Sequence, residues 1–313
     1  MSFMLELSER SFMEISKNIN KIVDYLSIGA IIAVLLLVTD GSVMLFATCP
    51  ILLALVYLTK GFKEFGISFI MAIVFAFLFI SPDVIASDLV PIFLISLLFI
   101  LMTRSTISDK YQILISFLII SLILIIVYKL AMVEAGLDIT KLANDLYEEL
   151  KLSTSYDLKL EYIESVFALY PAMIASLSLI YSAISLRIIR NYLAYKKMGK
   201  DMVALRDIRL DKKDFSTIII TSIILYFIAR FLGVKDIYIR TNLIWICLSI
   251  LMFNGMGVYD YMLSRRKSLL SRGLQWFFVI VFFYIFAVFF VIIGFADIFM
   301  DIRNKARRSY GQI

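Results

Sequence analysis

The chain has 313 residues, of which 62% are hydrophobic and 18% charged, and its formal net charge is +6. Soluble domains are roughly 45–50% apolar and 25% charged, so this chain lacks the polar surface needed to cover its apolar residues in water. Its mean hydropathy of +0.93 excludes a soluble enzyme, a secreted disulfide scaffold and a disordered protein. Composition therefore predicts an integral membrane protein with the lipid bilayer as its solvent.

Apolar runs along the chain approach the ~20 residues that a transmembrane helix needs. In chain order, the nine runs are 22–38, 42–58, 65–80, 89–102, 111–131, 167–189, 215–231, 239–262 and 273–295. We predict an all-α polytopic bundle of about nine spans, in a membrane domain of residues 22–300. An amphipathic segment precedes it at 1–21, and a basic tail follows it at 301–313.

The loops between the runs differ in charge, and lysine and arginine are retained in short loops on the cytoplasmic side. The stretch 187–213 holds nine basic residues, whereas 132–164 holds three among many acidic ones. We therefore predict a cytoplasmic loop at 190–213, an outer acidic segment at 132–164, and a cytoplasmic N-terminus in the cell membrane. The basic tail disagrees with this alternation, because nine spans place it outside.

The outer side of the predicted bundle carries charges of both signs. Apolar residues of the acidic segment recur at helical spacing in Ile139, Leu142, Leu146 and Leu150, which predicts a helix lying on the outer face. At the outer mouth of the seventh and eighth runs stand Arg230, Lys235 and Arg240. We expect these basic residues to pair with the acidic segment, and the alternative is that they attract an anionic ligand.

Polar side chains at membrane depth are costly and indicate a functional site. Ser178 and Ser182 lie on a small, polar stripe of the sixth run, and Asn242 and Asn254 lie in the eighth. Neutral groups hydrogen-bond a polar ligand without burying charge, so these four are the predicted ligand-binding residues. The alternatives are close helix packing for the serines and an interhelical hydrogen bond for Asn254. The sequence Asn254-Gly255-Met256-Gly257 also predicts a local helix irregularity that exposes backbone groups to a cavity.

Sequence features that support catalysis are missing. The chain contains no histidine, which excludes catalytic triads and metal sites that need an imidazole. It has neither the dinucleotide-binding nor the phosphate-loop glycine motif, and no cluster with metal-ligand spacing. We therefore predict no catalytic residue, no metal and no cofactor, and expect that the protein is not an enzyme. Tyr192 and Tyr195 interleave with the basic loop, but we attribute that loop to membrane orientation rather than to nucleic-acid binding.

The order of these features resembles the YybS-like family of uncharacterised multi-spanning membrane proteins. The resemblance rests on Pro50 in the second run, on YPAMIASLSLIYSAISLRIIRNYLAYKKMG at 170–199, on NGMG at 254–257, and on GFADIFMDIR at 294–303. It covers most of the chain. The family name implies a membrane-embedded helical fold and brings no activity with it.

A second resemblance is to the substrate-binding subunits (S-components) of energy-coupling-factor vitamin transporters, whose six-helix layout is similar to the first six runs. That resemblance implies docking onto a partner subunit through small residues of the first helix, here Gly29 and Ala33. We therefore predict binding or transport of a small solute with separately encoded membrane partners. The alternative is a membrane scaffold or assembly factor whose basic loop recruits a cytoplasmic protein.

Overall fold

The computed structural model describes residues 43–77, 82–153, 159–266 and 269–305, which form α-helices and one short 3-10 helix, with no strand among them. The predicted all-α class is thereby confirmed. The N-terminal segment, the first run with Gly29 and Ala33, and residues 306–313 of the tail lie outside the described residues. The chain divides into two compact units, one of 1–106 with 185–201 and one of 107–184 with 202–313.

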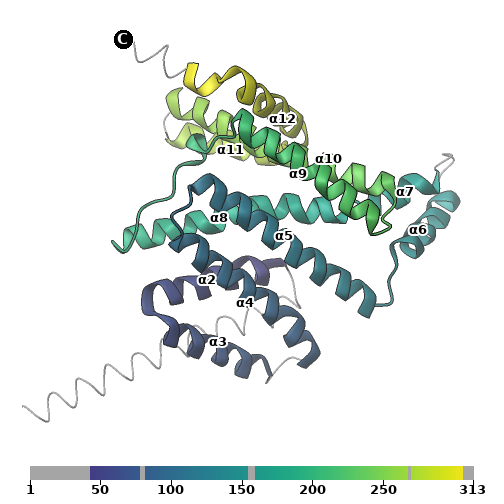
Figure 1. Cartoon of the computed structure of the whole chain (residues 1–313), viewed down its shortest axis with the longest axis horizontal. Coiled ribbons are helices and arrows are strands. Elements are labelled where there is room, and N and C mark those ends of the chain that lie inside the picture. The colour runs from purple at the N-terminus through teal and green to yellow at the C-terminus, as the bar shows by residue number, and fades with distance from the viewer. Residues whose placement is uncertain (1–42, 78–81, 154–158, 267–268, 306–313) are drawn as a thin grey trace, which may run out of the picture. The chain divides into compact units, whose positions relative to one another are not determined.

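The first unit contains a group of three apolar helices (Figure 1). They are α2 (Val43–Lys60), α3 (Phe62–Phe77) and α4 (Pro82–Arg104), and α2 packs against both of the others. Leu53, Phe65 and Phe99 are fully buried among them. Gly61 connects α2 to α3 with a φ of 111°, a conformation that glycine adopts without the clash of a Cβ atom. The short turn therefore keeps the two helices adjacent.

The second unit contains the remaining elements of the described chain. They are α5 (Asp109–Glu134), α6 (Ile139–Ser153), α7 (Leu160–Phe167), the start of α8 (Tyr170–Tyr195), η1 (Leu205–Asp207), α9 (Lys212–Phe231), α10 (Asp236–Arg266), α11 (Leu269–Val281) and α12 (Phe283–Met300). Five segments of the described residues are long and apolar enough to cross a bilayer: Asp109–Glu134, Leu160–Tyr195, Lys212–Phe231, Asp236–Arg265 and Phe283–Met300. The expectation of a multi-spanning membrane protein rests on these segments.

Most predicted runs coincide with one helix each, from α2 for 42–58 to α10 for 239–262. The predicted outer helix also forms, as α6. The prediction of one continuous helix over 273–295 is wrong, because α11 ends at Val281 and α12 begins at Phe283. Phe282 between them has φ −105° and ψ 33°, outside the helical range. The run is apolar on both sides of this break, so hydropathy gives no sign of it.

Two glycines bring α10 and α12 into direct backbone contact. A Cβ atom on Gly255 would lie 1.9 Å from the carbonyl oxygen of Phe290, and one on Gly294 would lie 2.0 Å from that of Leu251. Helix α10 continues unbroken through this region. The expected helix irregularity at 254–257 is therefore wrong, because Gly255 serves close helix packing instead of interrupting the helix.

Candidate ligand-binding cavity

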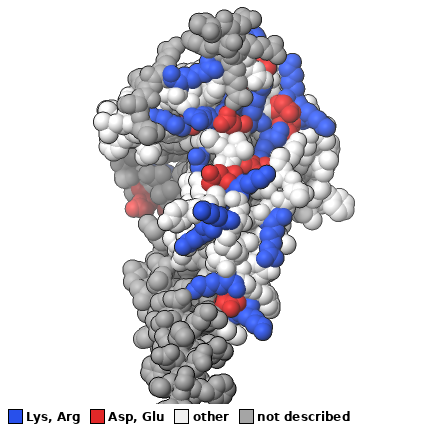
Figure 2. Space-filling view, turned by 90° about the vertical axis from the view of Figure 1, so that its left-hand side faces the viewer, with Lys and Arg blue, Asp and Glu red and all other residues white. Residues whose placement is uncertain are grey.

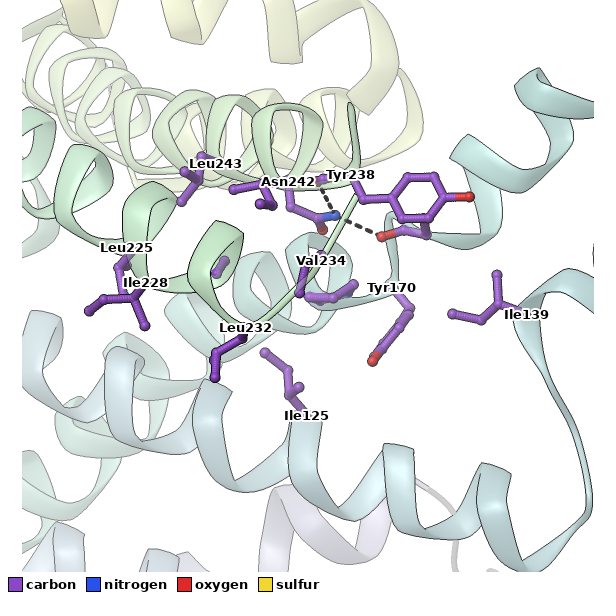
Figure 3. Close-up of a pocket in the computed structure, with 14 residues that line it drawn as sticks. Ile125, Ile139, Tyr170, Leu225, Ile228, Leu232, Val234, Tyr238, Asn242 and Leu243 are labelled. Atoms are coloured by element: carbon purple, nitrogen blue, oxygen red, sulfur yellow. Dashed lines mark hydrogen bonds between the residues drawn. The ribbon is translucent and has the colours of Figure 1, made fainter. Parts of the chain in front are cut away.

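A cavity of about 460 Å³ lies within the second unit. Its volume falls within the roughly 300–1,000 Å³ that is usual for small-molecule sites. Side chains from five helices and the turn after α9 surround it (Figure 3). The lining residues are Ile125, Ile139, Ala168, Tyr170, Pro171, Leu225, Ile228, Ala229, Leu232, Val234, Tyr238, Ile239, Asn242 and Leu243. Most of the wall is aliphatic, so the cavity favours an apolar occupant.

Asn242 stabilises the part of the wall at the connection between α7 and α8. Its Nδ2 donates to the carbonyl oxygens of Ala168 at 2.7 Å and Tyr238 at 2.9 Å, and its Oδ1 accepts from the backbone N–H of Ala172 at 2.9 Å. Helix ends leave backbone groups without intrahelical partners, and this one amide satisfies groups of both helices. Pro171 occupies the first turn of α8, where a missing N–H costs nothing. Asn242 therefore positions the wall, and its hydrogen-bonding capacity is used by the backbone.

Tyr238 of the cavity wall takes part in a hydrogen-bonded ion pair between α7 and the turn before α10. Glu164 accepts from Lys235 Nζ at 3.1 Å and from the Tyr238 hydroxyl at 2.7 Å. The hydrogen bond that Lys235 donates to Glu164 raises the pKa of Lys235, and a second one that it donates to the Tyr238 hydroxyl adds to the effect. The expected pairing of the basic mouth with the acidic outer segment is thus confirmed at Lys235.

The two arginines of the mouth have other partners. Arg240 Nη2 lies 2.5 Å from the carboxylate of Asp236, one turn earlier in α10. Arg230 donates to the hydroxyl of Tyr226 at 2.9 Å within α9. Both contacts are local to one helix and exposed, so they position the mouth less firmly than the Glu164–Lys235 pair does.

Comparison with known protein families gives a match over most of the chain. The family model described as a predicted membrane protein (DUF2232) matches residues 26–298. The chain belongs to this family. Searches of curated proteins and of solved structures each return no match. Family membership and the apolar helices together identify a membrane protein with several membrane-spanning helices.

Among the four predicted ligand-binding residues, the cavity wall of this DUF2232 member contains Asn242 alone. Ser178 and Ser182 are buried in α8, where the Ser182 hydroxyl donates to the Ser178 carbonyl at 2.7 Å. A neighbouring serine that the sequence did not single out, Ser176, shares a hydrogen bond of 2.6 Å with Ser249 and so joins α8 to α10. The helical spacing of Ser178 and Ser182 identified the polar stripe. Spacing alone does not show which face of α8 meets α10.

Asn254 lies away from the cavity, in a buried polar network. Its Oδ1 accepts from Arg303 Nη2 at 2.7 Å and from the backbone N–H of Leu210 at 3.2 Å, and its Nδ2 donates to the Gly294 carbonyl at 2.9 Å. Arg303 also forms an ion pair with Asp297 at 2.8 Å, and both side chains are at most 3% exposed. The network connects α10, α12 and the segment that precedes α9.

A second polar cluster lies at the start of α9. The buried Asp214 accepts from Lys110 Nζ at 2.6 Å and from the Tyr111 hydroxyl at 3.0 Å, which joins α9 to α5. Asp211 caps α9 by accepting from the Asp214 N–H at 2.9 Å, and this hydrogen bond lowers the pKa of Asp211. On the face shown in Figure 2, basic side chains predominate and acidic ones lie among them. The Asp214 cluster lies at the start of α9, and the Glu164–Lys235 pair lies just beyond its end. Both therefore lie outside the apolar middle of this helix.

Proposed function

We propose that this protein binds a small solute in the cavity of the second unit and moves it across the cell membrane with separately encoded partner subunits. The cavity carries the proposal, because its size and its wall of several helices are those of a small-molecule site. The layout resemblance of the first six runs to S-components supports the need for partners. The predicted outer position of the acidic segment, whose Glu164 pairs with Lys235, supports an opening of the cavity toward the outer side.

A second candidate is a scaffold that recruits a cytoplasmic protein through the basic loop. One observation favours it: the end of that loop is held in a fixed conformation. Arg303 Nη1 donates to the carbonyls of Arg206 and Ile208, at 3.1 and 2.7 Å, and the carboxylate of Asp109 accepts from the Val203 N–H at 2.7 Å. A fixed backbone presents the same surface to a partner each time.

Purification from native membranes distinguishes the two functions. Ala229 lines the cavity from α9, so Ala229→Phe fills space in it, whereas Ile220→Phe adds the same ring at a site on α9 that is 58% exposed. We expect a small molecule, identified by mass spectrometry, to co-purify with the wild type and Ile220→Phe and to be lost from Ala229→Phe. Equal retention by both variants would remove the cavity from consideration. Capture of a cytoplasmic protein alone, unaffected by Ala229→Phe, would favour the scaffold.

A further inference from the structure

From the chemistry of the cavity wall we infer the class of ligand, an inference that rests on the proposed function. The ligand is an amphipathic molecule with an apolar body and one uncharged hydrogen-bonding end, and that end meets the hydroxyl of Tyr170. A chain of a bilayer lipid with its ester group and a free apolar alcohol or ketone share this chemistry.

The apolar body follows from the side chains that face the cavity. Ile125 of α5, Ile228 of α9 and Leu243 of α10 contribute aliphatic surface from three directions, and Pro171 closes the side of α8. Burying apolar surface is worth roughly 25 cal/mol per Å², whereas a polar group buried without a partner is penalised. A ligand that fills this space with hydrocarbon therefore binds better than a polar one of equal size.

The hydrogen-bonding end follows from which polar groups of the wall have partners. The amide of Asn242 is used by backbone groups, and the hydroxyl of Tyr238 donates to Glu164. The Tyr170 hydroxyl makes no hydrogen bond with any described residue. Its ring lies 4.9 Å from that of Tyr128, and the side chain extends from α8 into the space between Ile125 and Ile139 (Figure 3). Tyr170 is thus the polar group of the wall that remains for a ligand.

The absence of charge on that end follows from the residues of the wall and the mouth. None of the described residues that line the cavity is ionisable at neutral pH, since tyrosine remains protonated there. Of the three basic residues at the mouth, Lys235 is paired with Glu164 and Arg240 with Asp236, and Arg230 donates to the hydroxyl of Tyr226. A charged ligand would have to give up its hydration without gaining an opposite charge, which is far costlier than burying a hydroxyl or carbonyl that finds one partner.

Binding to the full chain in phosphatidylcholine nanodiscs tests this class. The probes are dodecanol, dodecanoate and dodecyltrimethylammonium, which share one chain and differ in the charge of the end group, and empty nanodiscs correct for partition into lipid. We expect saturable binding of dodecanol and at least about 10-fold weaker binding of both ions. One neutral hydrogen bond contributes about 0.5–1.5 kcal/mol, so Tyr170→Phe should weaken dodecanol binding by about 2- to 10-fold. Ala229→Phe should abolish it, and Ile220→Phe should preserve it.

The outcomes separate the ligand class from the proposed function. The inferred ligand class is wrong if dodecanoate binds as tightly as dodecanol. It is also wrong if Tyr170→Phe has no effect while Ala229→Phe still blocks binding. In both cases the cavity remains the binding site. If Ala229→Phe binds dodecanol like the wild type, the cavity is not the site and the proposed function fails with it. Mass spectrometry of the natural occupant identifies its source. A lipid or an uncharged apolar solute supports the class, and a charged water-soluble molecule overturns it.

Discussion

Arg303 is a cation buried at 2% exposure, and every N–H of its guanidinium has an acceptor. Nε and Nη2 donate to Asp297, Nη2 also donates to Asn254, and Nη1 donates to the carbonyls of Arg206 and Ile208. A buried charge is stable only with an ion-pair partner and full hydrogen bonding. Asn254 is the neutral member that completes this set, which gives it a structural task whatever ligand the protein binds.

Asn254→Leu should destabilise the protein substantially. The change leaves an N–H of Arg303, the N–H of Leu210 and the carbonyl of Gly294 without their partner in a buried site, and each unsatisfied buried group costs about 1–3 kcal/mol. We expect a loss of about 3 kcal/mol, measured by thermal unfolding in detergent. The exposed Asn191→Leu is the control and should unfold like the wild type. An unchanged melting temperature for Asn254→Leu would show that the network contributes no net stability.

At the scale of elements, the glycines of α10 and α12 determine how closely those helices approach. Close backbone contact in a membrane protein gains van der Waals packing, which replaces the hydrophobic driving force that lipid does not supply. The approach also places Asn254 within reach of the Gly294 carbonyl. Glycine is therefore required here for space and not for backbone flexibility.

Gly294→Ala should lower stability, because its Cβ would overlap the Leu251 carbonyl and force α12 away from α10. Overpacking of this kind costs about 1–3 kcal/mol. Gly273→Ala in α11 is a matched change with no neighbour within 4 Å of the new Cβ. It should raise stability by roughly 0.5–1 kcal/mol through helix propensity alone. Thermal unfolding of the two variants should give shifts of opposite sign, and shifts of the same sign would contradict the packing role of Gly294.

The same elements show how far the sequence alone predicts this fold and this site. Hydropathy located α2 to α5 and α8 to α10, since a bilayer-spanning helix must be apolar along its length, and helical spacing located α6. Hydropathy did not reveal the break at Phe282, which lies between residues of equal apolarity. The sequence also did not reveal the partner of Asn254, because Arg303 lies 49 residues away in the chain. The cavity was missed for the same reason, because residues from Ile125 to Leu243 meet only after folding.

At the scale of the molecule, contacts within the second unit order its spans relative to one another. Glu164 meets Lys235 at one end of α9, and Lys110 meets Asp214 at the other. The 20 residues of α9 correspond to a length of about 30 Å, the thickness of the hydrocarbon core. The acidic segment and the end of the basic loop therefore lie at opposite ends of a span, as the charge distribution of the sequence predicts.

The beginning of the tail lies beside the end of the basic loop, since Arg303 donates to the carbonyls of Arg206 and Ile208. Nine spans place the tail on the opposite side, but the break at Phe282 divides the last run. Helix α11 has 13 residues, a length of about 20 Å, which is shorter than the hydrocarbon core. We therefore expect α11 and α12 together to leave the side of the basic loop and return to it, an arrangement that agrees with a basic tail under the positive-inside rule.

Labelling with an impermeant thiol reagent tests this sidedness in intact cells. With Cys49 and Cys247 replaced by alanine, single cysteines are introduced as Glu148→Cys in the acidic segment, Val203→Cys in the basic loop and Tyr310→Cys in the tail. We expect labelling of Glu148→Cys alone, with the other two labelled only after the membrane is permeabilised, because the Arg303 contacts hold the start of the tail beside residues 206–208. Labelling of Tyr310→Cys together with Glu148→Cys in intact cells would place the tail outside. In that case α11 and α12 would cross the bilayer an odd number of times, and the Arg303 contacts would not form in the membrane.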